Sequence, residues 1–455
     1  MMQVIFQRDY YLLPLYLALV FIIVFLFRKK ANIDKTTNKI YFIAFGVKVI
    51  GALSFAFVLQ YYYGSGDSMV YFSEASSFHN HIIDKPSNLR FFFASVDQYA
   101  LLSDLAHTGR TYFVIDSSAL VVIKLATFFS LLSFNTYLTT TLFFVLLSFS
   151  GLWAIFLIFS KLYPLLKKQL AWGILYLPSL NFWSSGIMKD SITIAALGWL
   201  FYSFYMFFIL KRRKSVYLVI SIISIYLMLV IKYYIIAAIS IAFILSGIFT
   251  LLLNLRPVAL RVGLIVGILI SIFILFTTEN SEQTFLSSAS IDIIVDEIAT
   301  QQRLYLTNKT VDEGNFDAGS LTPTLSGLLE KIPEAIVAVL YRPFIWESKK
   351  FMIFLSGFEN FILMILSIII IIRAGLFNFL KIILTHNLVR FCLFFTIILA
   401  IIIGLTTFNF GTILRYKAPC MPFYTSFLIL INYYASVSRQ KKAHTNTKLL
   451  FFNIL

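Results

Sequence analysis

Residues 137–160 read YLTTTLFFVLLSFSGLWAIFLIFS, an apolar stretch without a charged side chain. A helix of about 20 residues crosses the roughly 30 Å of hydrocarbon in a bilayer, so this stretch predicts a membrane-spanning helix. Similar runs recur along the 455-residue chain, which is 60% hydrophobic and 13% charged and has a mean hydropathy of +0.87. These values predict an all-α, polytopic bundle of transmembrane helices, since a spanning β-barrel would show short alternating segments instead.

We expect a single integral membrane domain over residues 1–455, with eleven crossings. The predicted spans are residues 11–27, 40–60, 137–160, 170–186, 191–210, 216–231, 235–253, 262–277, 352–372, 390–406 and 418–435.

Basic residues gather in short clusters between these runs, and the chain carries a formal charge of +16. The clusters are Arg28/Lys29/Lys30/Lys35/Lys39, Lys161/Lys167/Lys168, Lys211 to Lys214, Arg256/Arg261, Arg373/Lys381/Arg390 and Arg439/Lys441/Lys442/Lys448. The positive-inside rule places all six in the cytoplasm. The basic balance therefore reflects membrane topology, and we expect no nucleic-acid partner.

The run at 118–134 does not fit this scheme as a crossing, because it would separate neighbouring basic clusters onto opposite sides. The run is short and carries Lys124, so it predicts a re-entrant or interfacial helix on the outer face. The N-terminus is then outside and the C-terminus cytoplasmic. Residues 61–134 and 278–351 form two large outer loops, and residues 436–455 form a cytoplasmic tail.

The first candidate site follows the second span, where Gly64-Ser65-Gly66-Asp67-Ser68 leaves the membrane. Two glycines permit a tight exit and leave Asp67 at the surface, where a carboxylate is suited to act as a general base or to orient a hydroxyl. Tyr71 and Glu74 follow on the same predicted helix and are supporting residues. The alternative is that Asp67 caps this helix.

The second candidate site is the tight outer turn before the span at 191–210, which holds Lys189 and Asp190. Charges at this level are costly unless they pair or bind something. Lys189 is therefore a candidate phosphate-binding residue, with Asp190 in support. The alternative is a Lys189–Asp190 pair at a helix start, with Asp190 as the cap.

Two further candidate sites each come just before a predicted span, at its outer end. The first precedes the span at 352–372 and the second precedes the span at 418–435. In Tyr341-Arg342-Pro343-Phe344-Ile345-Trp346-Glu347, Arg342 is a candidate phosphate clamp, Glu347 its orienting partner and Trp346 an interfacial anchor. In Arg415-Tyr416-Lys417, the two cations lie outside and suit a phosphate or diphosphate group, with Tyr416 in support. The alternative for Arg415 and Lys417 is contact with lipid phosphates.

Metal and cofactor chemistry has little support in the sequence. His79 and His81 lack a clear third ligand, and the chain contains no phosphate-binding loop or dinucleotide fingerprint. No cofactor is assigned, and a divalent metal ion is not indicated.

The layout resembles the GT-C superfamily of membrane glycosyltransferases, in which a catalytic acid in the first outer loop is followed by interfacial helices. Gly66-Asp67-Ser68 with Tyr71 is the matching stretch, and Arg415-Tyr416-Lys417-Ala418-Pro419-Cys420-Met421-Pro422 looks like a run near the end of bacterial members. The chain differs in lacking an adjacent acidic pair and a soluble C-terminal domain, and in having an extra N-terminal span.

This resemblance implies an enzyme that moves a sugar from a polyprenyl-phosphate carrier to a glycan or glycolipid acceptor. The reaction would take place on the outer face of a bacterial cytoplasmic membrane, in envelope polysaccharide assembly, with membrane lipids as the surroundings. An O-antigen or exopolysaccharide polymerase or ligase is the close alternative. A lipid-linked oligosaccharide flippase and a non-catalytic scaffold are alternatives of other classes.

Overall fold

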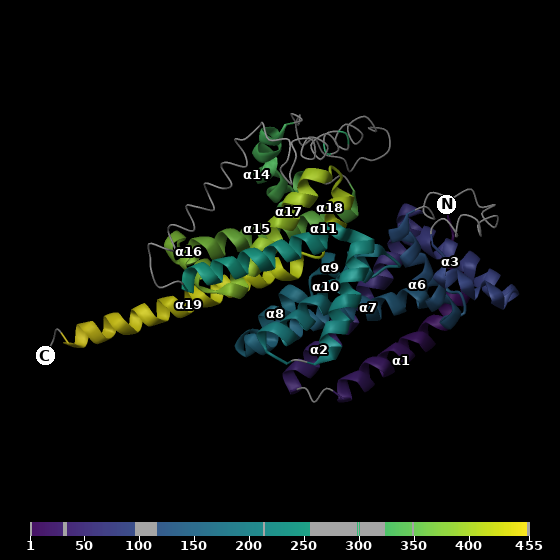
Figure 1. The fold of residues 1–455 in the computed structure, drawn as a ribbon, viewed down its shortest axis with the longest axis horizontal. Helices are drawn as coiled ribbons and strands as arrows, with labels where there is room; N and C mark the ends of the chain where they lie inside the picture. The colour runs from purple at the N-terminus through teal and green to yellow at the C-terminus, as the bar shows by residue number, and fades with distance from the viewer. Residues whose placement is uncertain are drawn as a thin grey trace. The chain divides into compact units, whose positions relative to one another are not determined.

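The computed structural model describes residues 2–30, 34–95, 116–212, 214–254, 298, 300, 324–347 and 350–452. Regular structure in these ranges is helical, without a β-strand (Figure 1). The chain divides into two compact units, residues 1–236 and 237–455. The expectation of one integral membrane domain over the whole chain stays a prediction.

The first unit is built around several long helices and shorter connecting ones. Its elements are α1 (Gln7–Lys30), α2 (Lys35–Phe57), the π-helix η1 (Val58–Tyr63), α3 (Asp67–Asp84), η2 (Pro86–Phe93), α6 (Ser117–Leu132), α7 (Tyr137–Leu162), η4 (Pro164–Leu166), α8 (Lys167–Ile174), α9 (Pro178–Trp183), α10 (Lys189–Phe204) and the π-helix η5 (Tyr205–Ile209). Helix α11 (Ser215–Asn254) contains the boundary between the units. The second unit continues with α14 (Leu325–Tyr341), η6 (Ile345–Glu347), α15 (Phe351–Ala374), α16 (Leu376–Thr385), α17 (Asn387–Thr406), α18 (Phe410–Tyr416) and α19 (Met421–Phe452).

Within the described ranges, seven helical segments are long and apolar enough to cross a membrane. They are Gln7–Arg28, Lys35–Tyr63, Tyr137–Leu162, Lys189–Ile209, Ser215–Leu253, Phe351–Ala374 and Asn387–Thr406. An all-helical fold with several candidate membrane spans is thereby confirmed, while the count of eleven crossings stays a prediction.

Some predicted spans differ from the helices. The span predicted at 170–186 consists of two short helices, α8 and α9, because Pro178 disfavours helical backbone at the residue before it and starts α9. The spans predicted at 216–231 and 235–253 correspond to the two halves of α11, which are two helices that meet at a kink where the backbone of Lys232 is non-helical. The span at 262–277 lies outside the described residues, and the predicted re-entrant run corresponds to the 16-residue helix α6.

Two side-chain contacts mark the opposite ends of the first unit. The Asp9 carboxylate accepts hydrogen bonds from the Phe6 N–H at 3.1 Å and from the Leu138 N–H at 2.8 Å, which joins the first turns of α1 and α7. Lys167, at the start of α8, pairs with Asp34 at 2.7 Å. This pair holds the pKa of the Asp34 carboxyl well below its ordinary value. The start of α1 and the start of α7 thus lie at one end of the unit, and the connection from α1 to α2 lies at the other. This arrangement is consistent with one membrane crossing by α1 and a return crossing by α2.

Helices α7 and α10 pack with their backbones in near contact. A Cβ atom built on Gly198 would lie 2.0 Å from the Gly151 carbonyl oxygen, and one on Gly151 would lie 2.4 Å from the Ile194 carbonyl oxygen. Small residues permit this approach between membrane helices, where dispersion forces take the place of the hydrophobic effect. The first unit therefore depends on glycine at both positions.

The second unit also has two helices that pack closely at a glycine, and it contains a buried arginine. A Cβ on Gly404 of α17 would lie 2.5 Å from the Ala335 carbonyl oxygen of α14. Arg390, only 2% exposed, donates to the Ile383 and Leu384 carbonyls near the end of α16 and to the Thr250 hydroxyl. A cation is favourable there because a helix carries partial negative charge at its C-terminus.

We expect Gly198→Ala to destabilise the first unit by about 1–3 kcal/mol, because the added methyl group meets the α7 backbone. The melting temperature in detergent, followed by size-exclusion chromatography after heating, should fall by roughly 2–4 °C for each kcal/mol. Gly46→Ala in α2 is the matched control, since a Cβ there has no atom within 4 Å. Equal melting temperatures for the two variants would contradict the close packing.

Candidate functional site

The first candidate site is the start of α3, and its backbone turns at glycine. The chain leaves η1 through Gly64, whose φ of +71° favours glycine, and Gly66 is the N-cap residue of α3. Asp67 is the first residue of the helix and is half-buried. The alternative that Asp67 is the N-cap is therefore wrong, although a carboxylate in the first turn still interacts favourably with the helix dipole.

Ser68 fixes the position of this helix start. Its buried hydroxyl lies 2.9 Å from the Tyr137 hydroxyl of α7 and accepts a hydrogen bond from the Ile187 N–H at 3.1 Å. Tyr71 and Glu74, predicted as supporting residues, are 3% and 7% exposed and belong to the buried face of α3. Asp67 thus precedes a residue that contacts from α7 and from Ile187 hold in place.

The residues between α9 and α10, together with the first two residues of α10, are here called the 184–190 segment and receive contacts from several distant parts of the first unit. Lys48 of α2, with no exposed surface, donates to the Ser184 carbonyl at 2.9 Å and to the Ser184 hydroxyl at 2.6 Å. Gly186 faces the Phe55 ring so closely that a Cβ would lie 2.3 Å from it. Two residues of α2 therefore contact the non-helical part of this segment directly.

The charged residues of the 184–190 segment pair with partners far along the sequence. Lys189 forms an ion pair of 2.5 Å with Asp116, the N-cap residue of α6. Asp190, which is fully buried, pairs with Lys232 at the non-helical position of α11. The alternative of a Lys189–Asp190 pair is wrong, because each residue has another partner and the N-cap position of α10 belongs to Met188.

Asp116 is held in its charged form. Burial alone would raise the pKa of its carboxyl, but the hydrogen bonds from Lys189 and from the Ser118 side chain and N–H together lower it. Asp116, within the first predicted outer loop, therefore places a carboxylate against the Lys189 ammonium, which orients that cation.

In the second unit, Arg342 and Glu347 contact one another as predicted. The Arg342 Nε and Nη2 atoms donate to Glu347 Oε1 at 2.9 and 2.6 Å, and the guanidinium lies 5.5 Å from the Phe410 ring centre. Glu347 Oε2 also accepts from the Phe344 N–H at 2.8 Å. The pair fixes the guanidinium plane, a condition for bidentate recognition of phosphate.

Asn360 of α15 joins the third and fourth candidate sites. Its amide donates to the Arg342 carbonyl at 2.9 Å, and its carbonyl oxygen accepts from Lys417 Nζ at 2.6 Å. Burial lowers the pKa of Lys417 to about 8, against the opposing effect of nearby Glu359 and Cys420. Lys417 is thus a buried cation, linked through Asn360 to the Arg342 backbone carbonyl, rather than a side chain extended into solvent.

The remaining predicted residues surround this cluster in the sequence. Arg415 is half-buried and lies 5.9 Å from the ring centre of Tyr416. Trp346 is 73% exposed and stacks on Phe344 at 5.0 Å, which suits an anchor at a membrane surface. The predicted residues therefore form two groups, with Asp67 and Lys189 in one unit and Arg342, Arg415 and Lys417 in the other.

Sequence reasoning did not single out Asp116, Lys232 or Asn360. Each had a local signal: Asp116 precedes two serines as an N-cap does, Lys232 interrupts an apolar run, and Asn360 lies within a predicted span. Their partners could not be predicted from the sequence because they lie far along the chain. Lys189 is 73 positions from Asp116, Asp190 is 42 from Lys232, and Lys417 is 57 from Asn360.

The described residues contain no group of three His, Cys, Asp or Glu side chains arranged to hold a metal ion. His79 Nδ1 lies 3.2 Å from the Ser130 hydroxyl, and His81 Nδ1 lies 2.7 Å from the Ser77 carbonyl. Both rings thus have partners within the protein.

Comparison with known proteins returned no matching family model, no similar curated protein and no similar solved structure.

We expect Asp190→Asn to destabilise the protein by about 3–5 kcal/mol, because it leaves Lys232 buried without its counter-charge. The double variant Asp190→Leu/Lys232→Met should recover much of that loss. Asp116→Asn is the control: its pair is part-exposed and asparagine also caps helices, so the change should be below about 1 kcal/mol. Melting temperatures in detergent test all three, and a harmless Asp190→Asn would contradict the buried pair.

The stability of the protein should also depend on pH through Lys417. The folded protein releases this proton near pH 8, whereas the unfolded chain holds it to about 10.5, so the unfolded state binds more protons between these values. Wild type should therefore gain stability relative to Lys417→Met as pH rises from 8 to 10.5, by up to about 1.4 kcal/mol per pH unit. Below pH 8 their difference should stay constant. Parallel melting curves of the two proteins across the upper window would contradict this.

Proposed function

We propose that the protein is a glycosyltransferase of envelope polysaccharide or glycolipid assembly that uses a polyprenyl-phosphate-linked sugar. In this reaction an acceptor hydroxyl attacks the anomeric carbon, Asp67 takes the hydroxyl proton, and the bond from that carbon to the carrier phosphate breaks. Polyprenyl phosphate leaves with the electron pair. The protein would work in a bacterial cytoplasmic membrane with its N-terminus outside and its C-terminus in the cytoplasm.

The observation that carries this proposal is the way in which the start of α3 is held. A general base must keep a defined position relative to the proton it removes. Asp67 follows a glycine turn and precedes Ser68, which contacts Tyr137 and the Ile187 N–H. The carboxylate-bearing residue therefore belongs to a rigid part of a unit built from candidate membrane spans.

Cations near the same segment support the binding of a phosphate. Lys189 follows Ile187 by two residues, and Asp116 orients its ammonium group. The second unit, taken by itself, carries two further candidate phosphate-binding cations: Asn360 contacts the Arg342 carbonyl and Lys417 Nζ, and Glu347 orients the Arg342 guanidinium. Fixed positive groups of this kind stabilise the charge that develops on a leaving phosphate.

Asp67→Asn tests the proposal. Membranes from a deletion strain complemented with each variant are supplied with a radiolabelled polyprenyl-phosphate sugar, and transfer to endogenous acceptor is counted. Loss of a general base should lower transfer by about 10²–10⁴-fold at an unchanged amount of inserted protein. Asp84→Asn, at the exposed last residue of α3, is the matched control and should transfer normally. Normal transfer by Asp67→Asn would remove Asp67 from the mechanism.

A flippase for lipid-linked oligosaccharides is a second candidate, favoured by two observations. Helices α8 and α9 form a broken helix, and buried Lys48 contacts its end at Ser184. Broken helices and buried ionisable groups are typical of transporters. The envelope glycans of the deletion strain separate the classes: a missing sugar supports the transferase, a ladder reduced to single repeats supports a polymerase, and lipid-linked intermediates that accumulate unmodified on the inner face support transport.

A further inference from the structure

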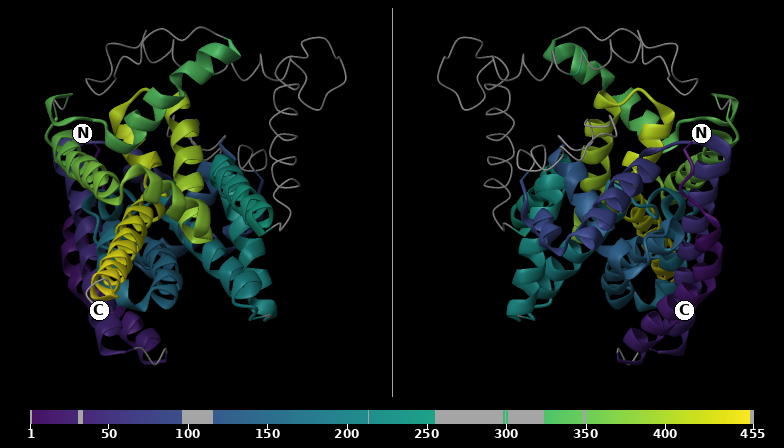
Figure 2. Two further views of the ribbon diagram at one scale, coloured as in Figure 1. Left: turned by 90° about the vertical axis from the view of Figure 1, so that its left-hand side faces the viewer. Right: turned by 90° about the vertical axis from the view of Figure 1, so that its right-hand side faces the viewer.

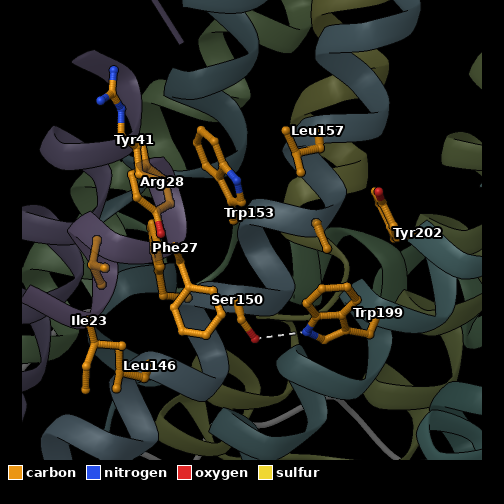
Figure 3. A pocket seen from close by; sticks show the side chains of 13 residues that line it. Ile23, Phe27, Arg28, Tyr41, Leu146, Ser150, Trp153, Leu157, Trp199 and Tyr202 are labelled. Carbon is orange, nitrogen blue, oxygen red and sulfur yellow. Dashed lines mark hydrogen bonds between the residues drawn. The ribbon is translucent and has the colours of Figure 1, made fainter. Parts of the chain in front are cut away.

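The first unit contains a cavity of about 450 Å³ between α1, α2, α7 and α10, at the end of the unit where α1 finishes (Figure 3). Its wall is mainly aromatic and aliphatic, with Phe149, Trp153, Trp199 and Tyr202 among the lining residues. Sites that hold small molecules usually measure about 300–1,000 Å³ and have such walls. The cavity is therefore large enough to hold part of a ligand.

The surroundings of the cavity are those of a lipid bilayer. All four helices that line it contain candidate membrane spans. Helix α1 lies along the edge of the unit in both views of Figure 2, and its outward residues Ile22 and Leu26 are 56% and 57% exposed. In a membrane, the acyl chains of lipids would therefore lie beside the cavity.

Water is a poor occupant because it needs two to four polar partners. The Ser150 hydroxyl, one of the few polar groups in the wall, already accepts a hydrogen bond from Trp199 Nε1 at 2.9 Å (Figure 3). An apolar chain fills such a space through dispersion contacts with the aromatic rings.

Arg28 supplies a charge at one end of the cavity. Figure 3 shows its guanidinium at the same end as Leu157, beyond the Tyr41 ring. Arg28 Nε is buried without a hydrogen-bond partner, and within the described part of the chain Arg28 forms no ion pair. The nearest acid in the sequence, Asp34, is paired with Lys167 at 2.7 Å. The guanidinium therefore remains available to an anion.

We propose that this cavity binds an anionic phospholipid, with an acyl chain among Trp153, Trp199 and Phe149 and the phosphate on Arg28. Basic pockets between membrane helices on the cytoplasmic side bind anionic headgroups, and the predicted topology places Arg28 on that side. The bound lipid ties α1 to the core of the first unit. This site lies at the opposite end of α2 from Asp67, so the proposal does not depend on the proposed transferase activity.

Quenching of tryptophan fluorescence tests the site directly. The full-length protein in detergent micelles is titrated with phosphatidylglycerol or phosphatidylcholine whose acyl chains carry bromine, which quenches nearby indoles. The signal from the cavity is the part that disappears in the variant Trp153→Phe/Trp199→Phe. We expect this signal to be half-quenched at about fivefold less phosphatidylglycerol than phosphatidylcholine.

Arg28→Gln should abolish the preference for the anionic lipid. Arg8→Gln, an exposed arginine near the other end of the same helix, is the matched control and should keep it. Leu157→Phe, which reduces the cavity without removing charge, should weaken quenching by both lipids. Equal quenching by both lipids in wild type, an undiminished preference in Arg28→Gln, or unchanged quenching in Leu157→Phe would each overturn the proposal.

Discussion

The first unit depends on polar contacts that distant parts of the chain make with the 184–190 segment. Irregular backbone at membrane depth is stable only where the protein itself satisfies it. Lys48, Ser68, Asp116 and Lys232 each donate to or accept from this segment, and they come from four different parts of the chain. The segment therefore determines where α2, α3, α6 and α11 meet.

In the second unit, the side-chain amide of Asn360 makes the corresponding polar contacts. Asn360 binds the Arg342 carbonyl through its donor and Lys417 through its acceptor, so a single side chain of α15 holds two cationic residues. The close crossing of α14 and α17 at Gly404 supports the helix that leads into Arg342. In both units, helices in near contact carry charged side chains at fixed positions.

These positions account for the chemistry that we propose. Lys189 and Arg342 each face an acidic partner, and such partners restrict the cation to one orientation before any substrate arrives. Arg28 differs from Lys189 and Arg342 because it forms no ion pair within the described part of the chain, and its buried Nε has no hydrogen-bond partner there.

The sequence by itself determined that the protein is all-helical and has several candidate membrane spans, because the length and apolarity of a spanning segment are local properties. It also indicated Asp67, Lys189 and Arg342, since a charge beside an apolar run is visible without a fold. The contact between Arg342 and Glu347 could be predicted because they are only five positions apart in the sequence. The pairs Lys189–Asp116, Asp190–Lys232 and Lys417–Asn360 were decided by the tertiary structure alone. The physical reason is that a buried charge requires a partner, but its energy depends on distance in space and not on separation along the chain.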